Sequence, residues 1–203
     1  MRLEESNQSV ELTNVDAWDL ILNIMFNLEQ RIEEKKIYIP DLNPENREVR
    51  ADKDMLHQVI YNLIDNAVKY TPVGGEINVS VTEENGKTVI AVRNTGQGIS
   101  EEEQARIFER FYKTDKSRGL DKGGTGLGLY IVKMLTSAMG GTAEVDSDGE
   151  SYTRFTVTLQ TAPSSKEKIA RTAKTEKGKT RSLWPKKSAS EGHSPRLPWG
   201  NKR

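Results

Sequence analysis

The sequence predicts an α+β domain over about its first 160 residues, followed by a basic tail. Three segments repeat apolar residues at steps of three and four, the spacing of one helix face. Two others, 76–93 and 142–160, alternate apolar and polar residues around turn residues, as β-hairpins do. Residues 161–203 hold only five large apolar side chains, too few to offset the entropy lost on ordering. We therefore expect residues 162–203 to be disordered.

The first segment predicts a helix from about Val15 to Lys35. Five apolar residues share one face of it: Trp18, Ile21, Met25, Leu28 and Ile32. Two short strand-like pieces, 37–42 and 48–51, follow around a turn of Pro and Asn residues.

The strongest helix signal begins near Asp52 or Asp54, either of which suits the N-cap, and ends at Pro72. Its apolar stripe contains six residues: Leu56, Val59, Ile60, Leu63, Ile64 and Ala67. A β-hairpin of residues 76–81 and 88–93 follows, joined by a turn at 84–87.

The last third begins with a short helix over 99–108, for which Ser100 is the expected N-cap. Residues 113–125 are polar and glycine-rich, which predicts a mobile loop. A fourth helix then carries four apolar residues on one face: Leu127, Ile131, Leu135 and Ala138. It ends at Gly140–Gly141, and a closing hairpin of 142–146 and 152–160 completes the domain.

Composition excludes several classes of function. The chain has no cysteine, hence no disulfide and no thiolate metal site, and its only histidines are His57 and His193, which argues against zinc. No apolar run reaches the ~20 residues needed to cross a bilayer. The sequence therefore predicts no membrane span and no signal peptide, and fits a reducing cytoplasm.

Charge is unevenly distributed along the chain. Residues 161–203 hold 12 Lys or Arg against 3 acids, which leaves 18 against 27 before them, so the body carries about −9 and the tail about +9. With Trp184 and Trp199, the tail could contact nucleic acid. A charged solubilising extension is the simpler interpretation, and we do not expect a nucleic-acid partner.

Four polar or glycine-rich motifs carry the chemistry. The first has Asn62, Asn66, Lys69 and Tyr70 on the helix face opposite the apolar stripe. Amide oxygens suit Mg²⁺, which takes its other oxygens from water and phosphates. A solvated helix face would give the same pattern.

The remaining motifs are the segments 94–99, 107–112 and 123–129. In the first, paired glycines let a backbone approach a flat ligand, although a tight turn needs them equally. The second places aromatic residues around a charged pair, which usually pins a helix end to a core. The third is dense in glycine and enters a helix, whose amides and dipole could hold phosphate oxygens.

In this order and spacing the four motifs resemble the N, G1, F and G2 boxes of sensor histidine kinases, over about residues 10–160. The resemblance implies the Bergerat ATP-binding fold of that superfamily, a two-layer α/β sandwich with a mixed β-sheet covered on one face by helices. It implies an ATP-binding catalytic domain at 11–161, preceded by the remnant of a dimerisation helix at 1–10. ATP and Mg²⁺ are the implied cofactors.

The resemblance also implies roles for individual residues. Asn66 would bind Mg²⁺, Asn62 and Lys69 would serve the phosphates, and Tyr70 would flank the nucleotide. Gly96 and Gly98 would line the adenine pocket, and 113–125 would form an ATP lid. The rest of the implied nucleotide-binding set is Asn94, Ile99, Phe111, Gly124, Thr125, Gly126, Leu127, Gly128 and Leu129.

The implied activity is transfer of the γ-phosphate of ATP to a histidine on a dimerisation domain absent from this chain. A response regulator receiver domain would be the next partner. In related ATPases of the gyrase type a glutamate activates water at the position of Asn62, so hydrolysis should be slow. His57 has no acidic neighbour and His193 lies in the tail, so neither is expected to be the acceptor.

One position departs from the family pattern, because the G1 box usually begins with aspartate and this chain has Asn94. An amide oxygen can still accept a bond from the adenine amino group, but without charge assistance.

Two alternative functions remain open. A related anti-sigma-type serine kinase or stand-alone ATPase would be favoured by an acid-stable seryl phosphate. A non-catalytic nucleotide sensor would be favoured by ATP binding without transfer.

Overall fold

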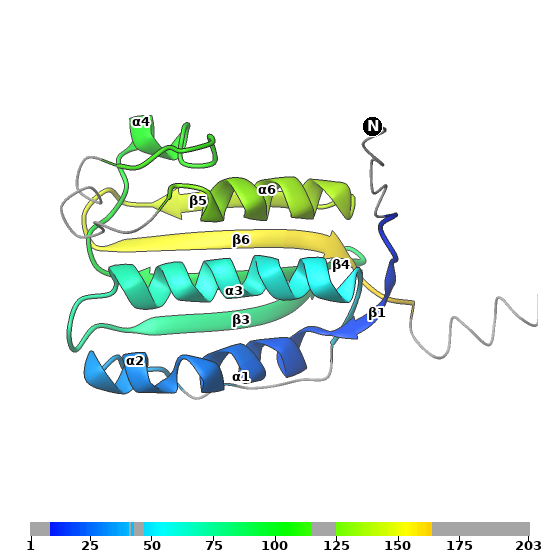
Figure 1. The fold of residues 1–203 in the computed structure, drawn as a ribbon, viewed down its shortest axis with the longest axis horizontal. Helices are drawn as coiled ribbons and strands as arrows, with labels where there is room; N and C mark the ends of the chain where they lie inside the picture. The colour runs from blue at the N-terminus through cyan, green and yellow to red at the C-terminus, as the bar shows by residue number, and fades with distance from the viewer. Residues whose placement is uncertain (1–8, 41, 43–46, 115–124, 164–203) are drawn as a thin grey trace, which may run out of the picture. The chain divides into compact units, whose positions relative to one another are not determined.

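A computed structural model describes residues 9–40, 42, 47–114 and 125–163 of the chain. Its helices and strands follow in this order: β1 (Thr13–Asp16), α1 (Ala17–Asn27), α2 (Glu29–Glu34), β2 (Glu48–Ala51), α3 (Lys53–Tyr70), β3 (Ile77–Glu84), β4 (Lys87–Thr95), α4 (Glu101–Gln104), α6 (Gly128–Ala138), β5 (Thr142–Ser147) and β6 (Tyr152–Gln160). Helices α3 and α6 lie across one face of the sheet, and α1 lies beside α3 (Figure 1). The predicted two-layer α/β sandwich is confirmed.

The main sheet has four strands in the order β3-β4-β6-β5, and all three pairs are antiparallel. β1 and β2 form a second, two-stranded antiparallel sheet. Among the described residues, the parallel component expected of a mixed sheet is reduced to one bridge, between Tyr38 and Glu76. The predicted hairpins are confirmed, and Asn85 and Gly86 of the first turn both have positive φ, as a two-residue hairpin turn requires.

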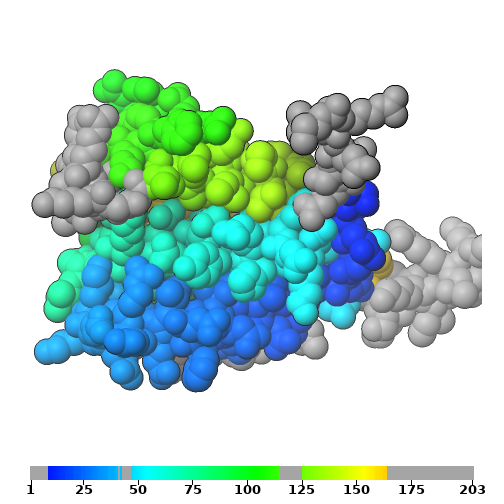
Figure 2. Space-filling model, viewed as in Figure 1, coloured from blue at the N-terminus to red at the C-terminus, as the bar shows by residue number. Residues whose placement is uncertain are grey.

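The core lies between the sheet and α3. All six residues of the predicted apolar stripe of α3 are at most 2 % exposed. They pack against the inward side chains of the strands, and α1 and α6 flank them on either side (Figure 2). Asp52 caps α3 by accepting the backbone N–H groups of Asp54 and Met55. The polar face of α3 is left free to line a cavity.

The predicted helix from Val15 to Lys35 is wrong at its start and in its continuity. Residues 13–16 form β1, because Val15 pairs with Val49, a partner too distant in sequence for local periodicity to indicate. Asp16 then caps α1. The helix breaks at Leu28, whose N–H is shared between Ile24 and Met25 carbonyls, and α2 continues to Glu34.

Three other predictions need correction. Residues 37–42 form no described strand beyond the bridge at Tyr38. The helix expected over 99–108 contracts to α4, although Ser100 caps it as predicted, in a capping box with Glu103. In α6 the buried residues are Val132 and Thr136, not the predicted stripe.

The stripe of α6 was misassigned because two of its members face a cavity instead of the core. Leu127 and Ile131 line that cavity, and Ala138 is exposed. Gly140 ends the helix with φ 77°, as predicted.

Several predictions fall outside the described residues. The dimerisation-helix remnant was predicted at 1–10, and its residues 1–8 are not described. The same is true of residues 115–124 of the ATP lid predicted at 113–125, and of residues 164–203 of the tail predicted at 162–203. Within the described part of the chain, no helix combines the length and apolarity needed to span a membrane.

Candidate functional site

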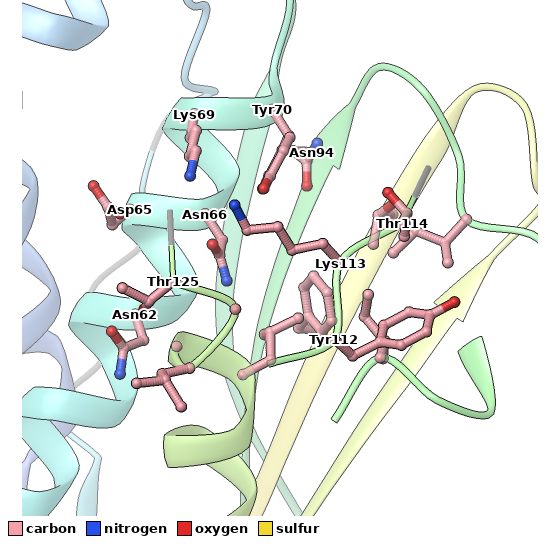
Figure 3. A pocket seen from close by; sticks show the side chains of 18 of the residues that line it. Asn62, Asp65, Asn66, Lys69, Tyr70, Asn94, Tyr112, Lys113, Thr114 and Thr125 are labelled. Atoms are coloured by element: carbon pink, nitrogen blue, oxygen red, sulfur yellow. The ribbon is translucent and has the colours of Figure 1, made fainter. Parts of the chain in front are cut away.

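A cavity of about 380 Å³ opens between the polar face of α3 and the segments that face it (Figure 3). That volume is within the range of pockets for small molecules and cofactors. Its walls come from α3, from β4 and β6, from residues 97–99, 107 and 112–114, and from the segment 125–131. All four motifs found in the sequence therefore contribute to one site.

On the α3 wall, Asn62, Asn66, Lys69 and Tyr70 all line the cavity, as their spacing predicts. Asp65 lines it too, and sequence analysis missed it because it directly precedes Asn66 and belongs to neither the apolar stripe nor the polar row. Asp65 forms an ion pair with Arg31 of α2, with 2.5 Å between Nη1 and Oδ1. The pair connects α2 to the cavity-facing side of α3.

The C-terminal end of α3 is held by Lys35. Its ammonium donates hydrogen bonds to the carbonyls of Val68, Lys69 and Thr71 at 2.9, 2.7 and 3.0 Å. Burial, and then the charge of Arg31, lower the pKa of Lys35 below its usual value. A cation at this position satisfies carbonyls that the helix end would leave unpaired, and so fixes the turn that carries Lys69 and Tyr70.

Opposite α3, the first residues of α6 face the asparagines directly. A Cβ placed on Gly128 would lie 3.7 Å from Asn62 Oδ1 and 4.0 Å from Asn66 Nδ2. The Nδ2 group of Asn62 is buried and has no hydrogen-bond partner among the described residues. A buried donor without a partner costs ~1–3 kcal/mol, so the site is suited to a ligand that supplies an acceptor there.

Positively charged side chains also line the cavity. Lys69 lies on α3, and Lys113 extends from the facing segment toward α3 (Figure 3). The start of α6, which has no side-chain cap among the described residues, adds the positive end of a helix dipole. Two ammonium groups, amide donors and a helix N-terminus together form an environment for an anionic, oxygen-rich ligand.

The far wall carries Asn94, which is buried at 5 % exposure near the end of β4. Its Nδ2 donates to the carbonyl oxygen of Thr95 at 3.1 Å, which turns the amide oxygen toward the cavity (Figure 3). Its neighbour in the register with β6 is Thr153, which is also buried and also lines the cavity. Asn94 therefore presents an acceptor to the cavity, as the variant G1 motif requires.

The glycines of the site differ in whether the surrounding protein leaves room for a side chain. A Cβ on Gly98 would lie 2.2 Å from the backbone nitrogen of Glu150, and one on Gly96 would lie 2.9 Å from the carbonyl oxygen of Tyr70. A Cβ on Gly126 would lie 2.9 Å from the backbone of Phe111. The protein's own backbone therefore excludes side chains at these three positions. Gly128 has ordinary room and no positive φ.

Most of the predicted nucleotide-binding residues line the cavity, and three do not or cannot be placed. Gly96 does not line it but packs behind it against Tyr70. Phe111 does not line it either and is 60 % exposed, with φ 63°. Gly124 lies outside the described residues.

Sequence analysis missed several lining residues besides Asp65: Gln97, Ile107, Tyr112, Lys113, Thr114, Ile131, Thr153 and Phe155. Tyr112, Lys113 and Thr114 belong to segments already singled out. Thr153 and Phe155 alternate on the inward face of β6, which the strand period could have indicated. Phe155 also packs edge-to-face against Phe108, with 6.2 Å between ring centroids, so the aromatic motif supports the site from behind.

The comparisons with known proteins agree with this arrangement. Residues 51–163 match the family model described as histidine kinase-, DNA gyrase B-, and HSP90-like ATPase. The sensor protein SrrB of Staphylococcus aureus is 42 % identical over 108 residues, which is 53 % of this chain and 18 % of that protein. The match therefore spans less than a fifth of the length of that relative.

Solved structures resemble the fold over about three quarters of the chain. The mycobacterial sensor histidine kinase MprB gives a TM-score of 0.65 at 26 % identity, covering 76 % of this chain and 100 % of that one. Full-length ShkA, solved in complex with AMPPNP, gives 0.64 at 30 % identity, covering 76 % of this chain and 32 % of that one.

The nucleotide-free catalytic domain of the histidine kinase ThkA gives a TM-score of 0.63 at 27 % identity, over 74 % of this chain and 95 % of that one. The matched structures thus share the fold over about three quarters of this chain. On its sequence and its fold, the chain belongs to the family of histidine kinase-, DNA gyrase B- and HSP90-like ATPases.

Proposed function

We propose that this chain is the ATP-binding catalytic part of a sensor histidine kinase, which transfers the γ-phosphate of ATP to a histidine on a separate dimerisation domain. The observation that carries the proposal is the opposition of Asn62, Asn66 and Lys69 on α3 to the N-terminus of α6 across one cavity. Phosphoryl transfer depends mainly on positioning and on neutralising the charge of the phosphate oxygens. The groups in this cavity supply both.

In the proposed assignment the phosphates lie between α3 and α6. The Asn62 amide, whose buried N–H group has no partner in the described part of the chain, would donate to a phosphate oxygen. Lys69 and Lys113 would add positive charge, and the amides at the start of α6 would hold further phosphate oxygens. The adenine would lie at the opposite end, against Asn94 and residues 97–99, as in the family's G1 motif.

Mg²⁺ fits the donor set at the α3 side. Asn66 supplies a neutral amide oxygen, and Asp65, although paired with Arg31, places a carboxylate next to it. Mg²⁺ uses few protein ligands and takes its remaining oxygens from water and phosphates. We assign Asn66 as the protein ligand; when bound, the metal would neutralise phosphate charge.

The cavity residues also favour a phosphoacceptor outside this part of the chain. The position from which related ATPases activate water is occupied by Asn62, whose amide cannot accept a proton. His57 is exposed on α3 and does not line the cavity. The histidine kinase ThkA has been solved in complex with the response regulator protein TrrA, and this complex supports a further partner. We propose the equivalent partners for this chain, a histidine-bearing dimerisation domain and a receiver domain.

The proposal is tested by incubating the chain with γ-labelled ATP and Mg²⁺, alone and with an added histidine-bearing dimerisation domain. We expect no labelling of the chain alone, and acid-labile, base-stable label on the added domain. Labelling of this chain that survives mutation of His57 and His193 would overturn the proposal in favour of a serine kinase. ATP binding with no transfer to any dimerisation domain would favour a nucleotide sensor.

The metal assignment has its own test in the Asn66→Ala variant. Mg²⁺ should strengthen ATP binding by the parent chain, and Asn66→Ala should lose most of that gain, at least the ~10-fold that disruption of a metal site typically costs. Asn78→Ala, on the exposed side of β3, is the matched control. Undiminished Mg²⁺ dependence in Asn66→Ala would refute the assignment.

A further inference from the structure

Residues 97–99 form one wall of the cavity, and both peptide groups of Ile99 are held by side chains that do not line it. The N–H of Ile99 donates to the hydroxyl of Ser147 at 2.9 Å. The carbonyl of Ile99 accepts from Nε2 of Gln104 at 2.8 Å. Ser147 ends β5 and Gln104 ends α4, so two elements remote in sequence fasten the same residue.

The two side chains belong to one connected network. Nε2 of Gln104 also donates to the Ser147 carbonyl at 3.1 Å. The Ser147 hydroxyl accepts a second bond from the Gly149 N–H at 3.2 Å and donates to the Tyr152 carbonyl. Its capacity as one donor and two acceptors is fully used. The hydroxyl thus ties Ile99 to the turn between β5 and β6.

Backbone packing supports the same connection. The N–H of Gly96 donates to the Ser151 carbonyl at 2.9 Å. Gly98 packs so closely on the turn that a Cβ would lie within 2.3 Å of both Gly149 and Glu150. The loop 97–99 therefore rests on the end of β5 and the β5–β6 turn through Gly98 and Ile99, and it has no regular secondary structure of its own.

We propose that Ser147 and Gln104 are positioning residues, which fix the loop 97–99 in its binding geometry before nucleotide arrives. The inference rests on the proposed function, because it takes this loop to be the wall against which the adenine binds. A loop ordered in advance spares the ligand the cost of ordering it on binding. Removing either bond should therefore weaken binding at the base end of the cavity and leave the phosphate end unchanged.

Backbone amide exchange of the full chain, measured without nucleotide, tests whether Ser147 and Gln104 hold the loop 97–99. Ser147→Ala removes the acceptor of the Ile99 N–H, and the exchange rate of that amide should rise about threefold to tenfold, as expected for one lost hydrogen bond. Ser147→Thr keeps a hydroxyl and should restore the parent rate. Ser137→Ala, which removes an exposed hydroxyl from α6, is the matched control. An unchanged Ile99 rate in Ser147→Ala would overturn the inference.

Ligand binding then tests whether losing these bonds weakens binding at the base end of the cavity. ADP should bind Ser147→Ala and Gln104→Ala about threefold to tenfold more weakly than the parent, and Ser147→Thr should recover the loss. Inorganic tripolyphosphate, which offers only the phosphate groups, should bind all variants equally. An equal loss for both probes would indicate general damage and overturn the positioning role. Binding of ADP and ATP to the parent protein alone tests the proposed function separately. If the parent bound neither nucleotide, the proposed function itself would be contradicted.

Discussion

The loop 97–99 and the start of α6 each place a glycine in the wall of one cavity, Gly98 and Gly128. Different constraints apply at the two positions. On the loop side, Gly98 is required by the backbone of the β5–β6 turn, on which it packs. On the helix side, Gly128 has space for a side chain and begins an 11-residue helix, where alanine would be more favourable. No close contact with the described residues requires glycine at this position, so we expect the requirement to come from a ligand in the cavity.

This difference separates two meanings of a glycine motif. Glycine at a nucleotide site is commonly explained by close approach of the ligand. Here that explanation suits Gly128, whereas Gly96, Gly98 and Gly126 are explained by contacts within the protein. A substitution in the loop wall should therefore lower the stability of the fold, whereas one in the helix wall should weaken ligand binding.

The largest effect is expected from Gly98→Ala. Its methyl group would collide with the backbone of residues 149 and 150, which cannot move aside as a flexible side chain could. Overpacking of this kind costs roughly 1–3 kcal/mol, and chemical denaturation should show a loss of that size in the free energy of unfolding. Unchanged stability would mean that the loop does not rest on the turn.

Gly128→Ala should show the opposite pattern. The free energy of unfolding should stay constant or rise by up to about 1 kcal/mol, because alanine is the better helix former. Affinity for ATP should fall about tenfold, since ~1.4 kcal/mol of crowding between the added methyl group and the bound phosphates corresponds to that factor. Titration calorimetry and denaturation of the same sample separate the two effects. A variant that loses stability and keeps its affinity would reverse the comparison.

Asn94→Asp sharpens the comparison on the loop side. A carboxylate should tighten adenine nucleotide binding by about 0.5–1.5 kcal/mol through a charge-assisted bond. It should also lower the stability of the nucleotide-free protein, because the side chain is buried and its bond to the Thr95 carbonyl is lost. ADP titration and thermal unfolding, with Asn78→Asp as the exposed control, measure both. Weaker binding would show that the amide already suits this position.

The smallest effect concerns the turn on which the loop rests. Hydrogen bonds from the Ser151 hydroxyl, and then from the backbone N–H groups of Ser151, Glu150 and Tyr152, hold the pKa of Asp148 far below its ordinary 3.8. A lowered pKa stabilises the fold above the unfolded value, and this stabilisation is lost as pH falls below about 4.

Asp148→Asn should therefore lower the thermal unfolding midpoint slightly at pH 7, and the gap from the parent should narrow below about pH 4. Melting curves of both proteins across that range provide the measurement. A gap that stays constant on acidification would show that the charge of Asp148 does not support the turn.

The sequence by itself determined the α3 wall of the site. Helix period places Asn62, Asn66 and Lys69 on one side and the six-residue apolar stripe on the other, so burial of the stripe turns the polar row toward the cavity. The hairpins and the caps at Asp52 and Ser100 were equally local, because turn residues and capping side chains act within a few positions.

Tertiary structure alone decided β1, the break in the first helix and the facing wall of the cavity. β1 exists because Val15 finds Val49, and the loop 97–99 holds its place because Ser147 and Gln104 reach it. The same holds for Gly98, whose need for glycine comes from a turn about fifty residues away in the chain. Local periodicity carries no information on such contacts, because pairing and packing between distant segments depend on how the whole sheet assembles.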